Sequence, residues 1–180
     1  MNKLLVVVDY QNDFVDGVLG FKKAESLEGD IYNKVNEYLK NGDNVLFTYD
    51  THSKEYLNTR EGKNLPILHC VIGTYGHELY GKLKKFKDAK NTIHINKHGF
   101  GMSPEQIISL DERIKKDIDY IEIVGVVTNM CVISNVITLQ SKYVNAEIVV
   151  NGALCASFDD SLHEKALDVI ESLQVKVINR

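Results

Sequence analysis

Cys131 is the strongest candidate for a nucleophile in this sequence. It follows an apolar run typical of a strand and a short connection, Gly125 to Thr128, so we expect it in the first turn of a helix over Met130–Lys142. A helix N-terminus carries a partial positive charge and unpaired N–H groups. These favour a thiolate and can hold a developing oxyanion. Packing in a core is the other common role of a free cysteine, and position alone leaves both roles open.

Asp9 and Lys97 are candidates to act beside such a thiol. Asp9 ends an apolar run, where a buried carboxylate is costly unless a cation or a thiol lies next to it. Lys97 ends another run, and a lysine there could pair with Asp9 and lower the pKa of a neighbouring thiol. The alternatives are a turn cap for Asp9 and a solvated surface position for Lys97.

A further set of residues has the types found in metal sites. Asp50-Thr51-His52 places two possible ligands on the same side of an extended segment, because alternate residues of a strand share a face. Glu61 and His69 follow eleven and nineteen residues after Asp50. A loop that returns both would complete an oxygen and nitrogen site suited to Zn²⁺, Mn²⁺ or Fe²⁺. Asp-x-His is also common in turns, so this pattern alone does not decide between a metal site and a turn.

These candidates need a scaffold that brings them together. Apolar, β-branched runs predict strands over residues 4–8, 45–49, 92–96, 120–127, 147–150 and 175–178. Helical patterns lie between them, and one begins with a capping box at Ser103-Pro104-Glu105-Gln106. Strands that alternate with helices form a mainly parallel sheet. We therefore predict an α/β fold with three layers, α/β/α, a mainly parallel six-stranded sheet and a single domain over residues 1–180.

The predicted sheet would gather the candidates at one edge. In such sheets ligands bind beyond the carboxyl ends of the strands. Asp9, Asp50 and Lys97 stand at the ends of three predicted strands, and Cys131 follows a fourth. The sequence therefore predicts one site at this edge.

Composition and charge narrow the classes of partner and compartment. The chain has 180 residues and a net charge of -4, without a basic run, which disfavours nucleic-acid binding. The apolar run before Asp9 is too short for a secretory signal or a membrane span. Three widely spaced cysteines do not indicate a disulfide framework, so we expect a cytoplasmic protein with reduced thiols and no membrane partner. Packing roles are expected for Cys70 and Cys155, and surface or capping roles for His77, His94 and His163.

Short motifs occur along the whole chain in a specific order and spacing. They are Asp9-Tyr10-Gln11-Asn12-Asp13-Phe14, Asp50-Thr51-His52, His69-Cys70-Val71-Ile72-Gly73-Thr74, Lys97 and Gly125-Val126-Val127-Thr128-Asn129-Met130-Cys131. In this arrangement the sequence resembles the isochorismatase-like cysteine hydrolases, and most closely their nicotinamidase branch. The resemblance implies an isochorismatase-like, Rossmann-like fold and a role in pyridine nucleotide salvage.

The resemblance implies a catalytic triad of Asp9, Lys97 and Cys131. In this scheme Asp9 accepts the thiol proton and later protonates the departing ammonia, while Lys97 stabilises the charged pair. The thiolate attacks the amide of nicotinamide and forms a thioester, which water hydrolyses to nicotinate. The backbone N–H groups of Val127 and Cys131 would hold the oxyanion.

The resemblance also implies a metal, a substrate contact and an assembly state. The metal ligands would be Asp50, His52, His69 and, as in some members, the glutamate Glu61, with Zn²⁺ expected and Mn²⁺ or Fe²⁺ as alternatives. Phe14 would pack against the substrate ring. The Val126–Val127 peptide bond would be cis. Members of this superfamily are commonly dimers or tetramers, so a homo-oligomer is expected.

Other functions stay open from the sequence. The same triad can act on a ureido or carbamoyl compound instead of nicotinamide. A non-catalytic small-molecule or metal-binding module could keep the fold, although it would not need an intact triad. A redox sensor based on Cys131 would require Cys70 or Cys155 to approach it in space.

Overall fold

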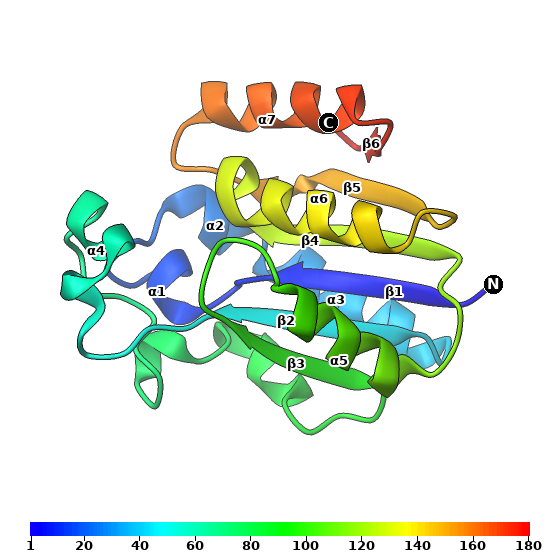
Figure 1. Ribbon diagram of the computed structural model, residues 1–180, viewed down its shortest axis with the longest axis horizontal. Coiled ribbons are helices and arrows are strands. Elements are labelled where there is room, and N and C mark those ends of the chain that lie inside the picture. Colours follow the sequence, from blue (N-terminus) through cyan, green and yellow to red (C-terminus); the bar gives the residue numbers. More distant parts are fainter.

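The computed structural model describes all residues from 1 to 180 and is built on one six-stranded sheet (Figure 1). The strands are β1 (Lys3–Val8), β2 (Asn44–Asp50), β3 (Thr92–Lys97), β4 (Tyr120–Val126), β5 (Glu147–Ala156) and β6 (Lys176–Ile178). Their order in the sheet is β3-β2-β1-β4-β5-β6, and every pairing is parallel. The predicted α/β fold is confirmed, and the sheet is parallel throughout.

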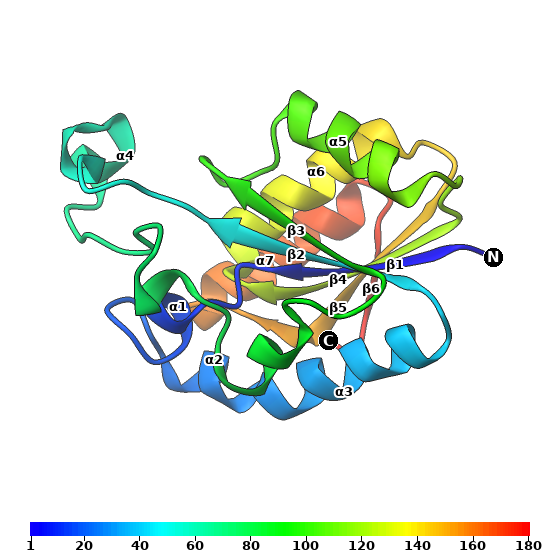
Figure 2. The ribbon, with the colours of Figure 1, turned by 90° about the horizontal axis from the view of Figure 1, so that it is seen from below.

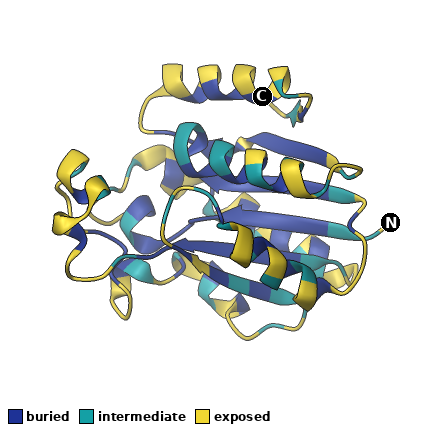
Figure 3. Ribbon diagram, in the orientation of Figure 1, coloured by how far each residue is buried: buried dark blue, intermediate teal, exposed yellow.

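The central strand explains why one apolar run dominates the N-terminal sequence. β1 pairs with β2 on one side and with β4 on the other, and Leu4–Val8 is completely buried (Figure 3). A parallel strand covered on both faces needs apolar side chains at every position, not only at alternate ones. This is the pattern that the sequence shows.

Helices cover both faces of the sheet. They are α1 (Asn12–Val15), α2 (Lys22–Ser26), α3 (Glu28–Lys40), α4 (Arg60–Asn64), α5 (Pro104–Ile114), α6 (Ile133–Lys142) and α7 (Asp160–Ser172). The apolar residues of α5, α6 and α7 share one core with the sheet, and those of α1, α2 and α3 share the other. Figure 2 shows α5 and α6 above the sheet and α2 and α3 below it. No helix has the length and apolar character needed to cross a membrane.

Short helical turns join several of these elements. They are the 3₁₀ turns η1 (Tyr56–Asn58), η2 (Tyr75–His77) and η3 (Gly81–Phe86), and the π-helical turn η4 (Thr128–Val132). The predicted start of α5 is confirmed, because Ser103 and Gln106 form a complete capping box with Pro104 at the first helical position.

The structure corrects two predicted boundaries. The helix expected over Met130–Lys142 is divided into η4 and α6, so Cys131 lies in a π-helical turn. The strand expected to end at Val150 continues to Ala156, which places Cys155 inside β5. Ile123 of β4 pairs with Val150, whereas Gly125 pairs with Cys155, so β5 carries extra residues in an irregularity around Gly152.

Candidate active site and metal centre

The carboxyl ends of four neighbouring strands supply the candidate site. Asp9 directly follows β1, Asp50 ends β2 and Lys97 ends β3. β4 leads through a cis peptide bond between Val126 and Val127 into η4, which carries Cys131. The structure thus brings together the residues that the sequence placed at one sheet edge, and it has the cis bond that the resemblance implies.

Asp9, Lys97 and Cys131 form a buried group around one ammonium. Lys97 Nζ lies 2.6 Å from Asp9 Oδ2 and 3.7 Å from Cys131 Sγ, and it donates to Gly99 O at 3.0 Å. Asp9 and Lys97 are completely buried, and Cys131 is 4% exposed. Because a buried ion pair is tolerated only when its remaining polar groups are satisfied, the Gly99 carbonyl is part of the site.

The charges of this group determine where its proton resides. Burial raises the pKa of the Cys131 thiol well above its usual range; Lys97 opposes this, whereas Asp9 and Asp50 add to it. Burial also raises the pKa of Asp9, with Lys97 again acting in the opposite sense. For Lys97 burial would lower the pKa, but Asp9, Cys131 and Asp50 outweigh it and raise the pKa. Lys97 therefore favours the charged forms of both Asp9 and Cys131, against the burial that disfavours them.

The turn that carries Cys131 is anchored by side chains from other elements. Thr128 Oγ1 lies 2.8 Å from Nδ1 of His163 on α7. Ser157 donates from Oγ to Asn129 Oδ1 at 2.6 Å. Val127 and Cys131, whose N–H groups the resemblance assigns to the oxyanion, both line the adjacent cavity. These contacts fix the turn relative to β5 and α7.

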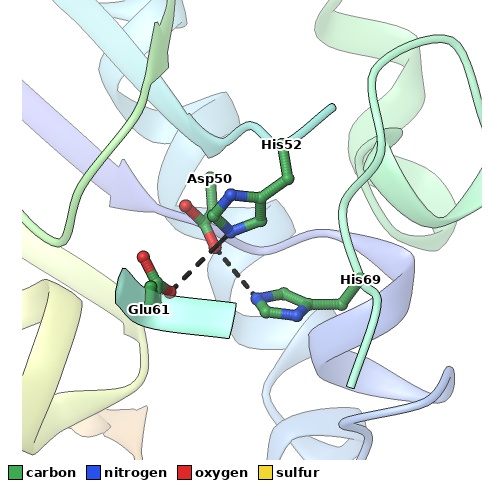
Figure 4. A group of neighbouring side chains, drawn as sticks. All are labelled: Asp50, His52, Glu61 and His69. Carbon is green, nitrogen blue, oxygen red and sulfur yellow. Dashed lines mark hydrogen bonds and ion pairs between the residues drawn. The ribbon is translucent and has the colours of Figure 1, made fainter. Parts of the chain in front are cut away.

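Asp50, His52, Glu61 and His69 form a second cluster beside this group (Figure 4). One potential ligand atom from each residue lies within 4.8 Å of those of the other three. Asp50 Oδ2 lies 3.0 Å from His52 Nε2 and 3.3 Å from His69 Nε2, and Glu61 Oε1 lies 3.8 Å from His52 Nε2. The structure brings all four predicted ligands together, Glu61 included.

The donor set fits a divalent cation. His69 Nδ1 donates to the carbonyl oxygen of Ile67 at 2.7 Å, so Nε2, which lies 3.3 Å from Asp50 Oδ2, is the nitrogen that could bind a metal ion. Asp50 Oδ2 is the oxygen that faces both histidines, whereas Oδ1 lies 3.9 Å from Lys97 Nζ. Two imidazole nitrogens and two carboxylates directed at one point form a set suited to Zn²⁺, Mn²⁺ or Fe²⁺. These four residues would hold such an ion.

A cavity of about 610 Å³ connects the two clusters. Cys131, Asp50, Glu61 and His69 contribute to its wall, and the remainder is mostly apolar, with Phe14, Leu19, Leu65, Phe100, Met130 and Phe158. The ring of Phe14 meets that of His69 edge to face, with the centroids 5.5 Å apart. A cavity of this size with few polar groups is typical of a site for a small organic molecule.

Several residues that support the site were missed or misplaced from the sequence. Gln11 holds the main chain of Asp50 by accepting from its N–H at 2.8 Å and donating to its carbonyl at 3.0 Å. Thr48 Oγ1 donates to Asp9 Oδ1 at 2.7 Å. His163, expected in a surface or capping role, is buried against Thr128. Gln11 lies inside a matched motif, and this was its only signal, whereas nothing local marks Thr48 or His163.

Comparisons with known proteins agree with this geometry. The family model described as "Isochorismatase domain" matches residues 3–180. The isochorismatase family protein PncA of Bacillus subtilis strain 168 is 31% identical over 174 residues, 93% of this chain and 93% of that protein. The crystal structure of nicotinamidase/pyrazinamidase PncA from Bacillus subtilis has a TM-score of 0.86 at 29% identity and covers 98% of this chain and 99% of its own. A pyrazinamidase of Pyrococcus horikoshii, solved in complex with zinc, shares the fold with a TM-score of 0.85 at 20% identity, over 100% of both chains.

Proposed function

The chain belongs to the isochorismatase family of hydrolases, and from this membership we propose that it is a cysteine-dependent amidohydrolase that converts nicotinamide and water to nicotinate and ammonia. One observation carries the proposal. A buried thiol with an adjacent carboxylate and ammonium opens into the same cavity as a four-residue metal-ligand set. The thiol group would carry out the hydrolysis. A metal ion bound by the ligand set could coordinate a ring nitrogen, which favours a substrate that contains one.

The first half of the reaction forms a thioester. The carboxylate of Asp9 takes the proton of Cys131 Sγ as the sulfur attacks the amide carbon, and Lys97 keeps both partners close. The carbonyl oxygen becomes an oxyanion, which the N–H groups of Val127 and Cys131 stabilise. When the tetrahedral intermediate collapses, Asp9 returns the proton to the amide nitrogen and ammonia leaves.

The second half releases the acid. With ammonia gone, Asp9 is again a carboxylate and removes a proton from a water molecule. The water oxygen attacks the thioester carbon, the oxyanion forms in the same position, and the C–S bond breaks. Asp9 protonates the departing sulfur, and the site returns to its starting state.

The metal-ligand set fits a role in holding the substrate. A bound divalent ion would offer a coordination position for the pyridine nitrogen and so orient the ring. Phe14 lies against His69 on the same wall and would pack against that ring. The carboxamide would then reach Cys131, which lines the same cavity.

The proposal is tested by ammonia release from the purified protein, together with metal analysis of the same sample. We expect one equivalent of a divalent metal, with Zn²⁺ first, and ammonia release from nicotinamide that is lost in Cys131→Ala. Turnover of ureido or carbamoyl compounds without turnover of nicotinamide would keep the cysteine mechanism and replace the substrate. Nicotinamide turnover that survives in Cys131→Ala would contradict the thioester.

A further inference from the structure

Asn135 of α6 is a buried polar residue that the proposed chemistry does not use. It is completely buried, and its carboxamide donates from Nδ2 to Cys131 O at 2.8 Å and to Phe100 O at 3.1 Å. Its Oδ1 accepts from Met102 N at 3.2 Å. A carboxamide is retained in a core only when it is hydrogen-bonded, so these contacts explain its burial. They join the turn of the nucleophile to a segment that is remote in sequence.

The segment that Asn135 holds is the direct continuation of the strand that bears Lys97. Gly99 O accepts a hydrogen bond from Lys97 Nζ, and the next residue, Phe100, lines the cavity. Lys97 and Cys131 come from different crossovers of the sheet. Their separation of 3.7 Å therefore depends on how β3 and its following loop are held against η4.

Gly101 shows how tightly this segment lies on α6. A Cβ atom at Gly101 would stand 3.1 Å from Ser134 O and 3.1 Å from Thr138 Oγ1, closer than ordinary van der Waals contact. A side chain at this position would require the segment or the helix to shift by a few tenths of an ångström. The close contact between this segment and α6 therefore depends on glycine at position 101 as well as on Asn135.

We propose that Asn135 is a positioning residue that holds the nucleophile Cys131 at its short distance from Lys97. One carboxamide fixes the carbonyl of Cys131 and, through Phe100 and Met102, the loop that supplies the Gly99 partner of Lys97. The inference rests on the proposed cysteine mechanism but not on the identity of the amide. A misplacement of catalytic groups by about 1 Å can lower a rate up to about a hundredfold.

The test compares Asn135→Ala with wild type in two assays. The first measures kcat and KM with nicotinamide, and the second measures the rate at which iodoacetamide alkylates Cys131 at one fixed pH. We expect kcat to fall by roughly tenfold to a hundredfold, KM to stay within about threefold, and alkylation to slow, because Lys97 no longer stands in place to favour the thiolate. Ser141→Ala is the matched control, since Ser141 Oγ donates to Ile137 O at 2.8 Å in the same type of bond on the same helix.

Specific results would overturn the inference. One is an unchanged kcat and an unchanged alkylation rate in folded Asn135→Ala. Another is a rise in KM alone, which would mean that Asn135 only supports the cavity wall at Phe100. If Asn135→Ala does not fold, Gly101→Val displaces the same segment with Asn135 intact and should give the same loss of kcat and of alkylation. If wild type does not turn over nicotinamide, the proposed substrate fails, and the alkylation assay still decides the role of Asn135.

Discussion

The buried triad and the segment 53–68, which carries Glu61, are two parts of one site built in different ways. Asp9, Lys97 and Cys131 are placed by the sheet and are 0–4% exposed. The segment contains only η1 and α4, and it extends beyond the carboxyl ends of the strands with most of its residues exposed (Figures 1 and 3). Its apolar residues Leu57, Ile67 and Leu68 are 49%, 39% and 42% exposed.

The difference separates the fixed part of the site from the adaptable part. The triad shares its support with the hydrophobic core, so a change there affects chemistry and stability together. The segment is held mainly by contacts within itself. Tyr56 donates to Leu65 O at 2.9 Å, and Gly62 packs so closely on η1 that a Cβ atom would lie 2.1 Å from Tyr56 O. We infer that the segment adapts the metal site through Glu61, while Asp9, Lys97 and Cys131, which the sheet places, perform the reaction.

Cys131→Ala should produce the largest effect and isolates the chemistry of the triad. Without the sulfur no thioester can form, and we expect kcat to fall by about 10⁴-fold or more, as for other enzymes that lose a nucleophile. Substrate should still bind, because the cavity wall and the metal ligands are unchanged. Ammonia release and equilibrium binding of nicotinamide check the two parts. Loss of both to the same extent would contradict the separation between reaction and binding.

Lys97→Met should combine a loss of rate with a loss of stability. We expect kcat to fall by about 10²- to 10³-fold, as when one group that stabilises charge is removed. Breaking a buried ion pair leaves Asp9 uncompensated, which costs about 3–5 kcal/mol of unfolding free energy. Lys97 lowers the pKa of Cys131, so its removal should raise that pKa further. The pH profile of alkylation should therefore move to higher pH, and a shift to lower pH would contradict the assigned charges.

Asp50→Asn and Glu61→Gln compare ligands from the two regions. Asp50 is buried at a strand end and contacts both histidines, whereas Glu61 is partly exposed on α4 and lies farther from them. We expect Asp50→Asn to abolish stoichiometric metal binding and Glu61→Gln to weaken it by about tenfold to a hundredfold. Titration with Zn²⁺ in the presence of a competing chelator measures both. Equal losses would mean that α4 is as fixed as the sheet.

The strand ends could be predicted from the sequence because their signals are local. Each of these apolar runs ends at or just before a charged residue. In a parallel sheet the carboxyl ends of the strands lie at one edge, so Asp9, Asp50 and Lys97 meet there. The return of Glu61 and His69 is a different matter. Their spacing allows a loop to bring them back, but only the resemblance to a family indicated that it does.

What the sequence could not show depends on long-range contacts. Nothing in the local sequence distinguishes Asn135 from another polar residue of a helix. Its role depends on the contact with Phe100, which lies in a distant segment. His163 has the same problem, since its partner Thr128 lies on another element. The extension of β5 past Val150 was hidden because Asn151 and Gly152 look like a turn, whereas pairing with β4 and β6 keeps the strand extended.

Thr59→Ala should produce the smallest effect and tests whether the segment is a unit of its own. Thr59 caps α4 by accepting from Gly62 N at 3.0 Å, and loss of such a cap costs about 1 kcal/mol. Because α4 contributes little to the core, the midpoint of thermal unfolding should stay close to that of wild type. Zn²⁺ affinity should fall by a few-fold, up to about fivefold for 1 kcal/mol, because Glu61 then spends less time at the cluster. A lower unfolding midpoint with unchanged Zn²⁺ affinity would show that α4 belongs to the cooperative core and does not move independently of it.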